Sequence, residues 1–139
     1  MKTALEKNIK YSDKFVQSLG TPEVSKEIRK IIQKEKVKTM IDMGWGDGIF
    51  VHAIKKEFPK IKITGIDISP RRIEGLKAKF PKDKFYVADV CDTKLKGTFD
   101  FIHSSQVIEH VPSDKKMVNE MRRLLKKGGT LFCSSVIKK

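Results

Sequence analysis

The sequence contains few of the residues that stabilise small secreted domains or that form membrane spans. Its 139 residues include two cysteines, Cys91 and Cys133, whose separation fits no metal-ligand spacing. No apolar run approaches the roughly 20 residues of a membrane-spanning helix. The first residues lack the apolar core of a secretory signal. We therefore predict a globular cytoplasmic protein with two buried, reduced thiols and no membrane partner.

Arginine is also scarce, because 25 of the 30 basic residues are lysines and the formal net charge is +13. Such a charge is typical of a surface that binds nucleic acid. It is equally typical of lysines that only solvate the faces of helices. The lysines are spread along the whole chain with few aromatic residues among them, which favours the second interpretation.

The hydrophobic pattern alternates between short apolar runs and segments with apolar residues at helical spacing. Thr21 and Pro22 predict a helix start, and Gly128 and Gly129 predict a helix end. Helices are predicted over 21–34, 49–58, 70–80 and about 117–125, with a further helical segment in 1–20, and strands over 37–43, 61–67, 84–89, 99–104 and 130–137. Alternating strands and helices predict a single α/β domain over 1–139, built on a mainly parallel sheet.

Three glycines at two-residue spacing, Gly44, Gly46 and Gly48, separate the first predicted strand from the next helix. A glycine turn between a strand and a helix N-terminus is a common place for a ligand, because backbone N–H groups meet the helix dipole there. The third glycine comes one residue too early for a dinucleotide fingerprint, and no Lys-Ser or Lys-Thr follows as in a P-loop. An ordinary tight turn remains an alternative.

Aspartates stand at the ends of the first three predicted strands, at Asp42, Asp67 and Asp89. In a parallel sheet these ends share one edge, where ligands bind. A carboxylate such as Asp67, which follows the glycines at about the required distance, suits the hydroxyl groups of a ribose. Aspartate is also common at strand ends as a turn or cap residue, but three matches behind one glycine loop favour a site.

These motifs together resemble the class I S-adenosylmethionine (SAM) dependent methyltransferases of the methyltransferase domain 11/12 type. The resemblance runs from about residue 21 to the end and rests on five segments: Ile41-Asp-Met-Gly-Trp-Gly-Asp-Gly48, Gly65-Ile-Asp-Ile-Ser69, Ala88-Asp-Val90, Phe99-Asp-Phe-Ile-His-Ser-Ser-Gln-Val-Ile-Glu-His-Val111 and Leu124-Leu-Lys-Lys-Gly-Gly-Thr-Leu131. It implies a Rossmann-like fold with helices on both faces of the sheet. The family fold normally adds two more strands after the fifth. We therefore expect strand 130–137 to be an open edge that pairs with another copy of the chain, or the sequence to be a truncated form.

The resemblance implies the site residues and a SAM cofactor. The cofactor-binding residues would be Asp42, Met43, Gly44, Trp45, Gly46, Gly48, Asp67, Ile68, Ala88, Asp89, Val90, Ser104 and Ser105. Asp67 would bind the ribose and Asp89 the adenine, while Ser104 and Ser105 would line the methionine end. Glu109 and His110 are candidate general bases, since a histidine has a suitable pKa; the alternative is that they only cap or pack a short helix.

Two features depart from the family pattern. Trp45 is bulky where the family usually has a small residue, so it either stacks over the ligand or crowds the pocket. Gln106 replaces the first glutamate of a metal-binding subfamily, so no metal is expected. The first interpretation is methyl transfer to a small molecule, or less favourably to RNA. The alternatives are a SAM-binding domain without complete catalytic machinery, and a nucleic-acid-binding protein without a cofactor.

Overall fold

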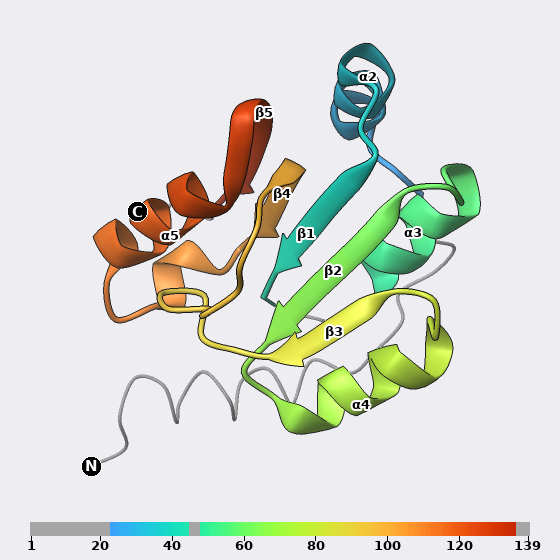
Figure 1. Ribbon diagram of the computed structural model, residues 1–139. Coiled ribbons are helices and arrows are strands. Elements are labelled where there is room, and N and C mark those ends of the chain that lie inside the picture. Colours follow the sequence, from blue (N-terminus) through green and yellow to red (C-terminus); the bar gives the residue numbers. More distant parts are fainter. Residues whose placement is uncertain (1–22, 45–47, 136–139) are drawn as a thin grey trace.

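The computed structural model describes residues 23–44 and 48–135, which form a five-stranded parallel sheet in the order β3-β2-β1-β4-β5 (Figure 1). The predicted helical segment in 1–20 lies outside the described residues. The elements are α2 (Lys26–Glu35), β1 (Thr39–Met43), α3 (Ile49–Glu57), β2 (Lys62–Asp67), α4 (Pro70–Lys79), β3 (Lys84–Val87), β4 (Phe99–Ser105), the short 3₁₀ helix η1 (Ile108–His110), α5 (Asp114–Leu124) and β5 (Leu125–Ser134). The predicted α/β fold with a parallel sheet is confirmed.

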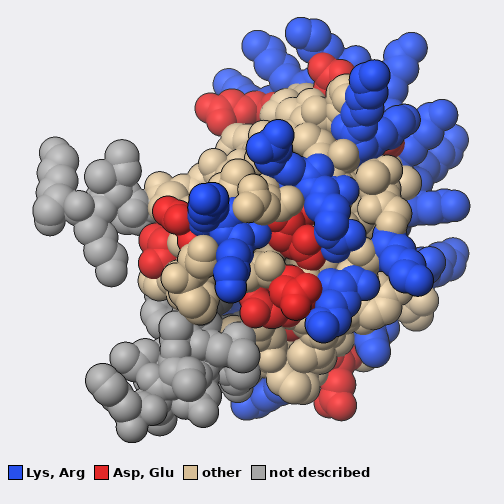
Figure 2. Space-filling view, turned by 60° about the vertical axis from the view of Figure 1, so that its left-hand side comes forward, with Lys and Arg blue, Asp and Glu red and all other residues tan. Residues whose placement is uncertain are grey.

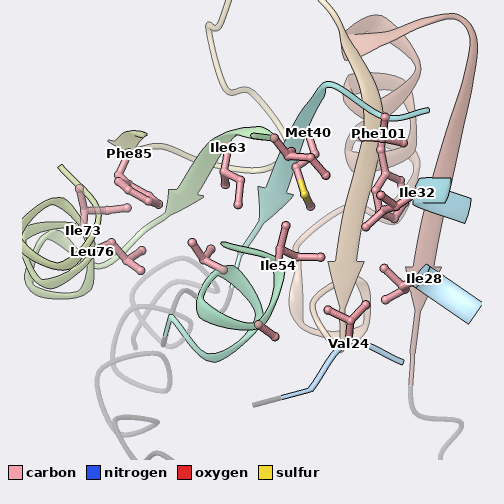
Figure 3. Packing of buried hydrophobic residues seen from close by; sticks show 14 residues of the cluster. Val24, Ile28, Ile32, Met40, Ile54, Ile63, Ile73, Leu76, Phe85 and Phe101 are labelled. Atoms are coloured by element: carbon pink, nitrogen blue, oxygen red, sulfur yellow. The ribbon is translucent and has the colours of Figure 1, made fainter. Parts of the chain in front are cut away.

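Each face of the sheet has its own apolar core. Helices α2, α3 and α4 pack on one face, where Ile28, Ile54 and Leu76 meet Met40 and Phe101 (Figure 3). On the other face α5 packs its Met117, Met121 and Leu124 against residues such as Ile41 and Ile102. Successive strand residues point to opposite faces, so Met40 and Ile41 belong to different cores. Helices therefore cover both faces, as the sequence predicts.

The strand order reverses at β1, which lies between β2 and β4. Chain connections run from β1 to β2 and β3 on one side and then cross to β4 and β5 on the other. In the register of the central strands, Asp42 lies beside Gly65 of β2 and beside His103 of β4. Crevices at such reversals, outside the carboxyl ends of the strands, are where parallel sheets bind ligands.

Serine side chains cap three of the helices. The hydroxyls of Ser25, Ser69 and Ser113 accept hydrogen bonds from backbone N–H groups three residues further on. The start at Ser69 with Pro70 in the first turn is the predicted one. Helix α2 begins at Lys26 and not at Pro22, because Ser25 supplies the cap; Thr21 and Pro22 lie outside the described residues.

The predicted end of the helix before the last strand is wrong. Helix α5 ends at Leu124 and not at the glycine pair, because Leu125 is already extended and pairs with Phe99 of β4. The register then shifts before Thr130 pairs with Phe101, and Gly128 adopts a positive φ of 83° within this irregular stretch. The glycines therefore accommodate an irregular strand start.

Both cysteines are free, as predicted, but Cys133 is exposed and Cys91 only half-buried. Cys133 lies at an outward position of the edge strand β5, and Cys91 follows β3 at the opposite edge. Partial burial, reinforced by the charge of Glu109, raises the pKa of the Cys133 thiol, and burial likewise raises that of Cys91. Both thiols are therefore poor nucleophiles at neutral pH.

Within the described ranges, no helix is long and apolar enough to cross a membrane.

A buried carboxylate joins the connection after β3 to α5. Glu120 accepts hydrogen bonds from the backbone N–H and the hydroxyl of Thr93, both at 2.6 Å, and from Arg123 at 2.7 Å. The guanidinium of Arg123, together with the bonds from Thr93, lowers the pKa of Glu120 to about 2. The folded state thus binds this proton more weakly than the unfolded state, in which the pKa is about 4.3.

We predict that Glu120→Gln lowers the free energy of unfolding by about 2–3 kcal/mol at pH 7, since the ionised carboxylate is what its partners stabilise. That contribution is present above about pH 4.5 and is lost as the pH falls toward 2. In urea unfolding, the difference between variant and parent should therefore shrink at pH 3. The exposed Glu74 on α4 offers a control, as Glu74→Gln should change little at either pH. An equal loss at both pH values would contradict the prediction.

Candidate ligand-binding site

The predicted site residues lie along the carboxyl edge of the sheet, on and after the ends of β1, β2, β3 and β4. Asp42 is the penultimate residue of β1, and Asp67 is the last residue of β2. Ser104 and Ser105 end β4. The topology thus brings together segments that are separated by up to about sixty residues in the chain.

Two glycines give the loop after β1 its shape. Gly44 has a φ of 90° and Gly48 a φ of 87°, a region that side chains strongly disfavour. A Cβ at Gly44 would lie 2.8 Å from Cγ2 of Val107, and the Gly44 N–H donates to the carbonyl of Ile66 at 2.9 Å. The loop therefore needs glycine for both its turn and its packing. Trp45 and Gly46 lie outside the described residues.

Asp42 forms a buried pair with a histidine of the neighbouring strand. Nδ1 of His103 lies 2.9 Å from Oδ1 of Asp42, and the two residues are only 6% and 7% exposed. A buried carboxylate needs such a partner. The bond fixes Asp42 two residues before Gly44, at the point where the loop leaves the sheet.

The imidazole of His103 lies between two aromatic rings. Phe50 in the first turn of α3 stacks on it with centroids 3.6 Å apart and planes at 4°, and Phe132 of β5 stacks at 5.8 Å and 9°. The group connects β1, β4, β5 and α3. His103 is not among the site residues that the sequence predicts. The available signal was a polar residue in the apolar strand 99–104, which needs a partner from an adjacent strand.

Asp67 is almost fully enclosed, at 1% exposure, and its Oδ1 accepts the Ser69 N–H at 2.8 Å. This bond forms the turn from β2 into the capped start of α4. Ile68 is half-buried in the same turn. The carboxylate therefore lies where the sequence predicts it, with its orientation fixed by the backbone.

The third acidic residue lies beyond the end of its strand, because β3 ends at Val87. Ala88 N–H donates to the carbonyl of Asp67 at 3.0 Å, which holds the segment against the end of β2. Asp89 is half-buried and accepts the Cys91 N–H at 2.8 Å, while Val90 packs into the core on the α5 side.

The serines at the end of β4 make contacts within the sheet. Ser104 is fully buried, and its hydroxyl donates to the carbonyl of Met43 at 3.0 Å. The hydroxyl of Ser105 lies 2.9 Å from that of Ser134 on β5. These bonds hold β1, β4 and β5 together at the carboxyl edge; a role of the serines toward a ligand stays a prediction.

A second polar group follows β4. Gln106 has a φ of 57° and donates its N–H to the carbonyl of Ser134 at 2.8 Å, which turns the chain into η1. On η1, Oε2 of Glu109 accepts from the hydroxyl of Ser135 at 2.7 Å. Nε2 of His110 lies 3.7 Å from Oε1 of Glu109. The two candidate bases are thus adjacent and half-buried.

The hydrogen-bond acceptors at this edge of the sheet fit an adenosyl ligand. Carboxylates accept hydrogen bonds from ribose hydroxyls and from an exocyclic amino group, and Asp67 and Asp89 lie at the ends of adjacent strands. The left-handed glycine turn of Gly44 and Gly48 leaves no side chain of its own at these positions. Among the residues described, no group of three or more His, Cys, Asp or Glu side chains forms a metal site.

A family model described as a methyltransferase domain matches residues 41–133. Curated relatives include trans-aconitate 2-methyltransferase of Enterobacter sp. (strain 638), 30% identical over 105 residues, and malonyl-[acyl-carrier protein] O-methyltransferase 1 of Ilyobacter polytropus, 32% identical over 104. These matches cover 76% and 73% of this chain but only 42% and 39% of the relatives. The chain thus spans about two fifths of their length.

Solved structures show the same fold. The sugar N-methyltransferase KedS8 of Streptoalloteichus sp. superposes with a TM-score of 0.69 at 21% identity, covering 79% of this chain and 46% of that one. The plantazolicin methyltransferase BpumL, solved with S-adenosylhomocysteine (SAH), gives 0.67 at 19% identity, covering 76% and 42%. At these identities the likeness establishes the fold only.

We predict that Gly44→Ala lowers the free energy of unfolding by about 2–4 kcal/mol, from a positive φ combined with a clash against Val107. Gly97→Ala is a matched control, because Gly97 has a φ of 92° and open space around its Cα, so it should lose only about 1–2 kcal/mol. Adding Val107→Ala should recover part of the Gly44→Ala loss beyond its own cost. Equal losses in the two single variants, measured by urea unfolding, would count against the clash.

Another prediction concerns the buried pair of Asp42 and His103. His103→Phe retains a ring between Phe50 and Phe132 but leaves the Asp42 carboxylate without the imidazole, and should cost about 2–4 kcal/mol of unfolding free energy. Phe132→Leu retains the pair and reduces only the stacking, so a loss of about 1 kcal/mol is expected. The idea fails if His103→Phe is as stable as the parent in thermal and urea unfolding.

Proposed function

We propose, for a chain that belongs to the methyltransferase domain family, that it binds S-adenosylmethionine at the carboxyl edge of its sheet and transfers the methyl group to a small-molecule acceptor. The observation that carries this proposal is the set of carboxylates behind a left-handed glycine turn, where the strand order reverses. The relatives' names support methyl transfer, while their acceptors differ from one another.

Each residue would have a separate task in holding the cofactor. Asp67, oriented by the Ser69 N–H, would accept from the ribose hydroxyls. Asp89 would accept from the adenine amino group, with Ala88 and Val90 beside the ring. Gly44 and Gly48 would allow close approach of the ligand, with Asp42, Met43 and the two serines at the methionine end. Trp45 and Gly46 complete the loop in the sequence.

When bound, the cofactor supplies an activated methyl group on a sulfonium. The protein then needs mainly to place the acceptor atom in line with that group, which provides much of the rate acceleration. His110, or Glu109 beside it, is proposed to take the proton of the acceptor. The hydroxyl of Ser135 holds the Glu109 carboxylate on one side, and the imidazole of His110 faces its other oxygen.

A second candidate function is cofactor binding without a complete catalytic site. The observation that favours it is that Glu109 already accepts a hydrogen bond from Ser135 and lies beside His110, as expected if both residues only pack the short helix. Cofactor binding alone would need the same residues at the ends of β1, β2 and β3. It would give no role to Glu109 or His110.

The outer edge of β5 gives a proposed contact with a second copy of the chain. This strand pairs with β4 on one side, and the described residues place no strand on its other side. An edge strand exposes N–H and C=O groups that can pair with another chain.

Calorimetric titration with SAH, with NAD as a control ligand, tests the binding step. Asp67→Asn should weaken SAH binding on the order of 100-fold, because it removes charged acceptors from two hydroxyls; the amide oxygen still accepts the Ser69 N–H. The exposed Asp92 gives the matched control, as Asp92→Asn should bind like the parent. Absence of saturable SAH binding, or equal affinity in the two variants, would refute the site.

The transfer step is measured with labelled SAM and a panel of small acceptors and RNA. With a basic role for the imidazole, His110→Asn should slow transfer about 100-fold while SAH affinity stays the same. Tight SAH binding without transfer to any acceptor would instead support the second candidate function.

A further inference from the structure

The same short pattern, Lys-x-Lys, stands at the start of three neighbouring strands. Lys36-Val-Lys38 leads into β1, Lys60-Ile-Lys62 into β2 and Lys82-Asp-Lys84 into β3. The three segments lie at the amino ends of adjacent strands, opposite the proposed cofactor site. We call the six lysines the amino-edge lysines.

In each segment the middle residue is turned inward and both lysines are exposed. The first lysine of each segment lies in the turn before its strand, and Lys36 is the C-cap of α2 with a φ of 51°. Val37 and Ile61 are 7% and 4% exposed and belong to the α2–α4 core. Asp83 accepts the Ile63 N–H at 3.0 Å. All six lysines are exposed.

The sheet holds these segments side by side. The N–H of Lys62 donates to the carbonyl of Lys38 at 3.0 Å, and Lys84 lies in register with Thr64, two residues beyond Lys62. Two inter-strand steps of about 4.8 Å place the three pairs within about 10 Å along the edge. Flexible lysine side chains on such an edge reach several phosphates of one polyanion.

Three acidic residues near this edge are engaged with other groups, while Glu35, next to Lys36, is exposed. Asp83 pairs with Lys55 at 3.2 Å, and Glu57 accepts two bonds from Arg29. Asp100 accepts the N–H groups of Lys38 and Thr39. The positive charge of the amino-edge lysines is therefore only partly compensated. Basic side chains also spread over the side of the molecule that Figure 2 brings forward, with acidic residues among them.

Compensation of helix dipoles does not account for these lysines. Helices α2, α3 and α4 end at the same edge, and basic residues in the last turn stabilise helix ends. Each of these helices already has its own basic residues there, namely Lys34, Lys55 and Lys56, and Lys77 and Lys79. The amino-edge lysines come in addition to them.

We propose that the amino-edge lysines bind the phosphate backbone of a nucleic-acid duplex. Membrane binding would need a set of apolar anchors beside the charges, whereas two of the four large exposed hydrophobic side chains of the described residues, Val118 and Leu131, lie on α5 and β5. Single-strand binding would need a row of exposed aromatic rings for base stacking. Tyr86, two residues after Lys84, is exposed, but the nearby Phe58 and Phe80 pack against the core. The surface therefore fits a regular array of phosphates.

This surface is independent of the proposed methyl transfer. It lies at the opposite ends of strands of four to six residues, about 13–20 Å from the carboxyl edge. A duplex bound here would therefore leave the cofactor site open.

The test measures fluorescence anisotropy of a labelled 20-base-pair RNA duplex between 50 and 200 mM KCl, with two variants of equal charge. The edge variant carries Lys60→Gln, Lys62→Gln, Lys82→Gln and Lys84→Gln. The control variant carries Lys26→Gln, Lys30→Gln, Lys115→Gln and Lys116→Gln, at exposed positions on α2 and α5. Circular dichroism and SAH titration check that both variants fold alike.

We expect the edge variant to bind at least tenfold more weakly than the parent, with a salt slope smaller by about two to four, because each lost phosphate contact removes about one unit. The control variant should stay within about threefold of the parent. Equal weakening in both variants would reduce the effect to net charge and overturn the proposal. So would salt-insensitive or absent duplex binding, or tighter binding to phosphatidylserine vesicles than to the duplex. SAH binding is read separately, so loss of the cofactor proposal leaves this result unaffected.

Discussion

The constraint on which this structure depends is that all five strands run in the same direction. Parallel strands need crossovers, and crossovers return the chain to the same edge each time. Every strand therefore enters at one edge of the sheet and leaves at the other. The two edges differ in what they carry: Asp42, Asp67 and Asp89 lie on or after strand ends, and lysine pairs lie before strand starts. One topological rule thus separates the edge that carries the aspartates from the edge that carries the lysines.

At the carboxyl edge, the buried contact between Asp42 and His103 does most to fix the geometry. It joins the strands on the two sides of the order reversal, β1 and β4, at adjacent register positions. Phe50 then connects the same imidazole to the start of α3, which follows the glycine turn. A buried polar pair of this kind is costly to separate, since either partner alone would be left desolvated. The loop between Met43 and Ile49 is consequently anchored at both of its ends.

Much of this was accessible from the sequence, because local signals there agree with the fold. The capped helix start at Ser69 and Pro70, the apolar strands and the glycine spacing each point to one arrangement. The failures came where tertiary contacts decide. Leu125 leaves its helix because Phe99 offers a strand partner, and Cys133 is exposed because its position on an edge strand faces outward. His103 was missed since only the register of β1 against β4 reveals its partner.

The arrangement of the lysines also becomes visible only once the strand order is known. Read along the chain, the lysines look evenly spread, which favours simple solvation of helix faces. The sheet order changes that interpretation, because β3, β2 and β1 are adjacent and their three Lys-x-Lys segments lie side by side at the amino edge of the sheet. Solvation alone requires no such alignment, since exposed lysines anywhere on the surface would serve equally. A repeated pair with an inward residue at its centre, held at the spacing of a sheet, is instead what a surface for regularly spaced phosphates requires.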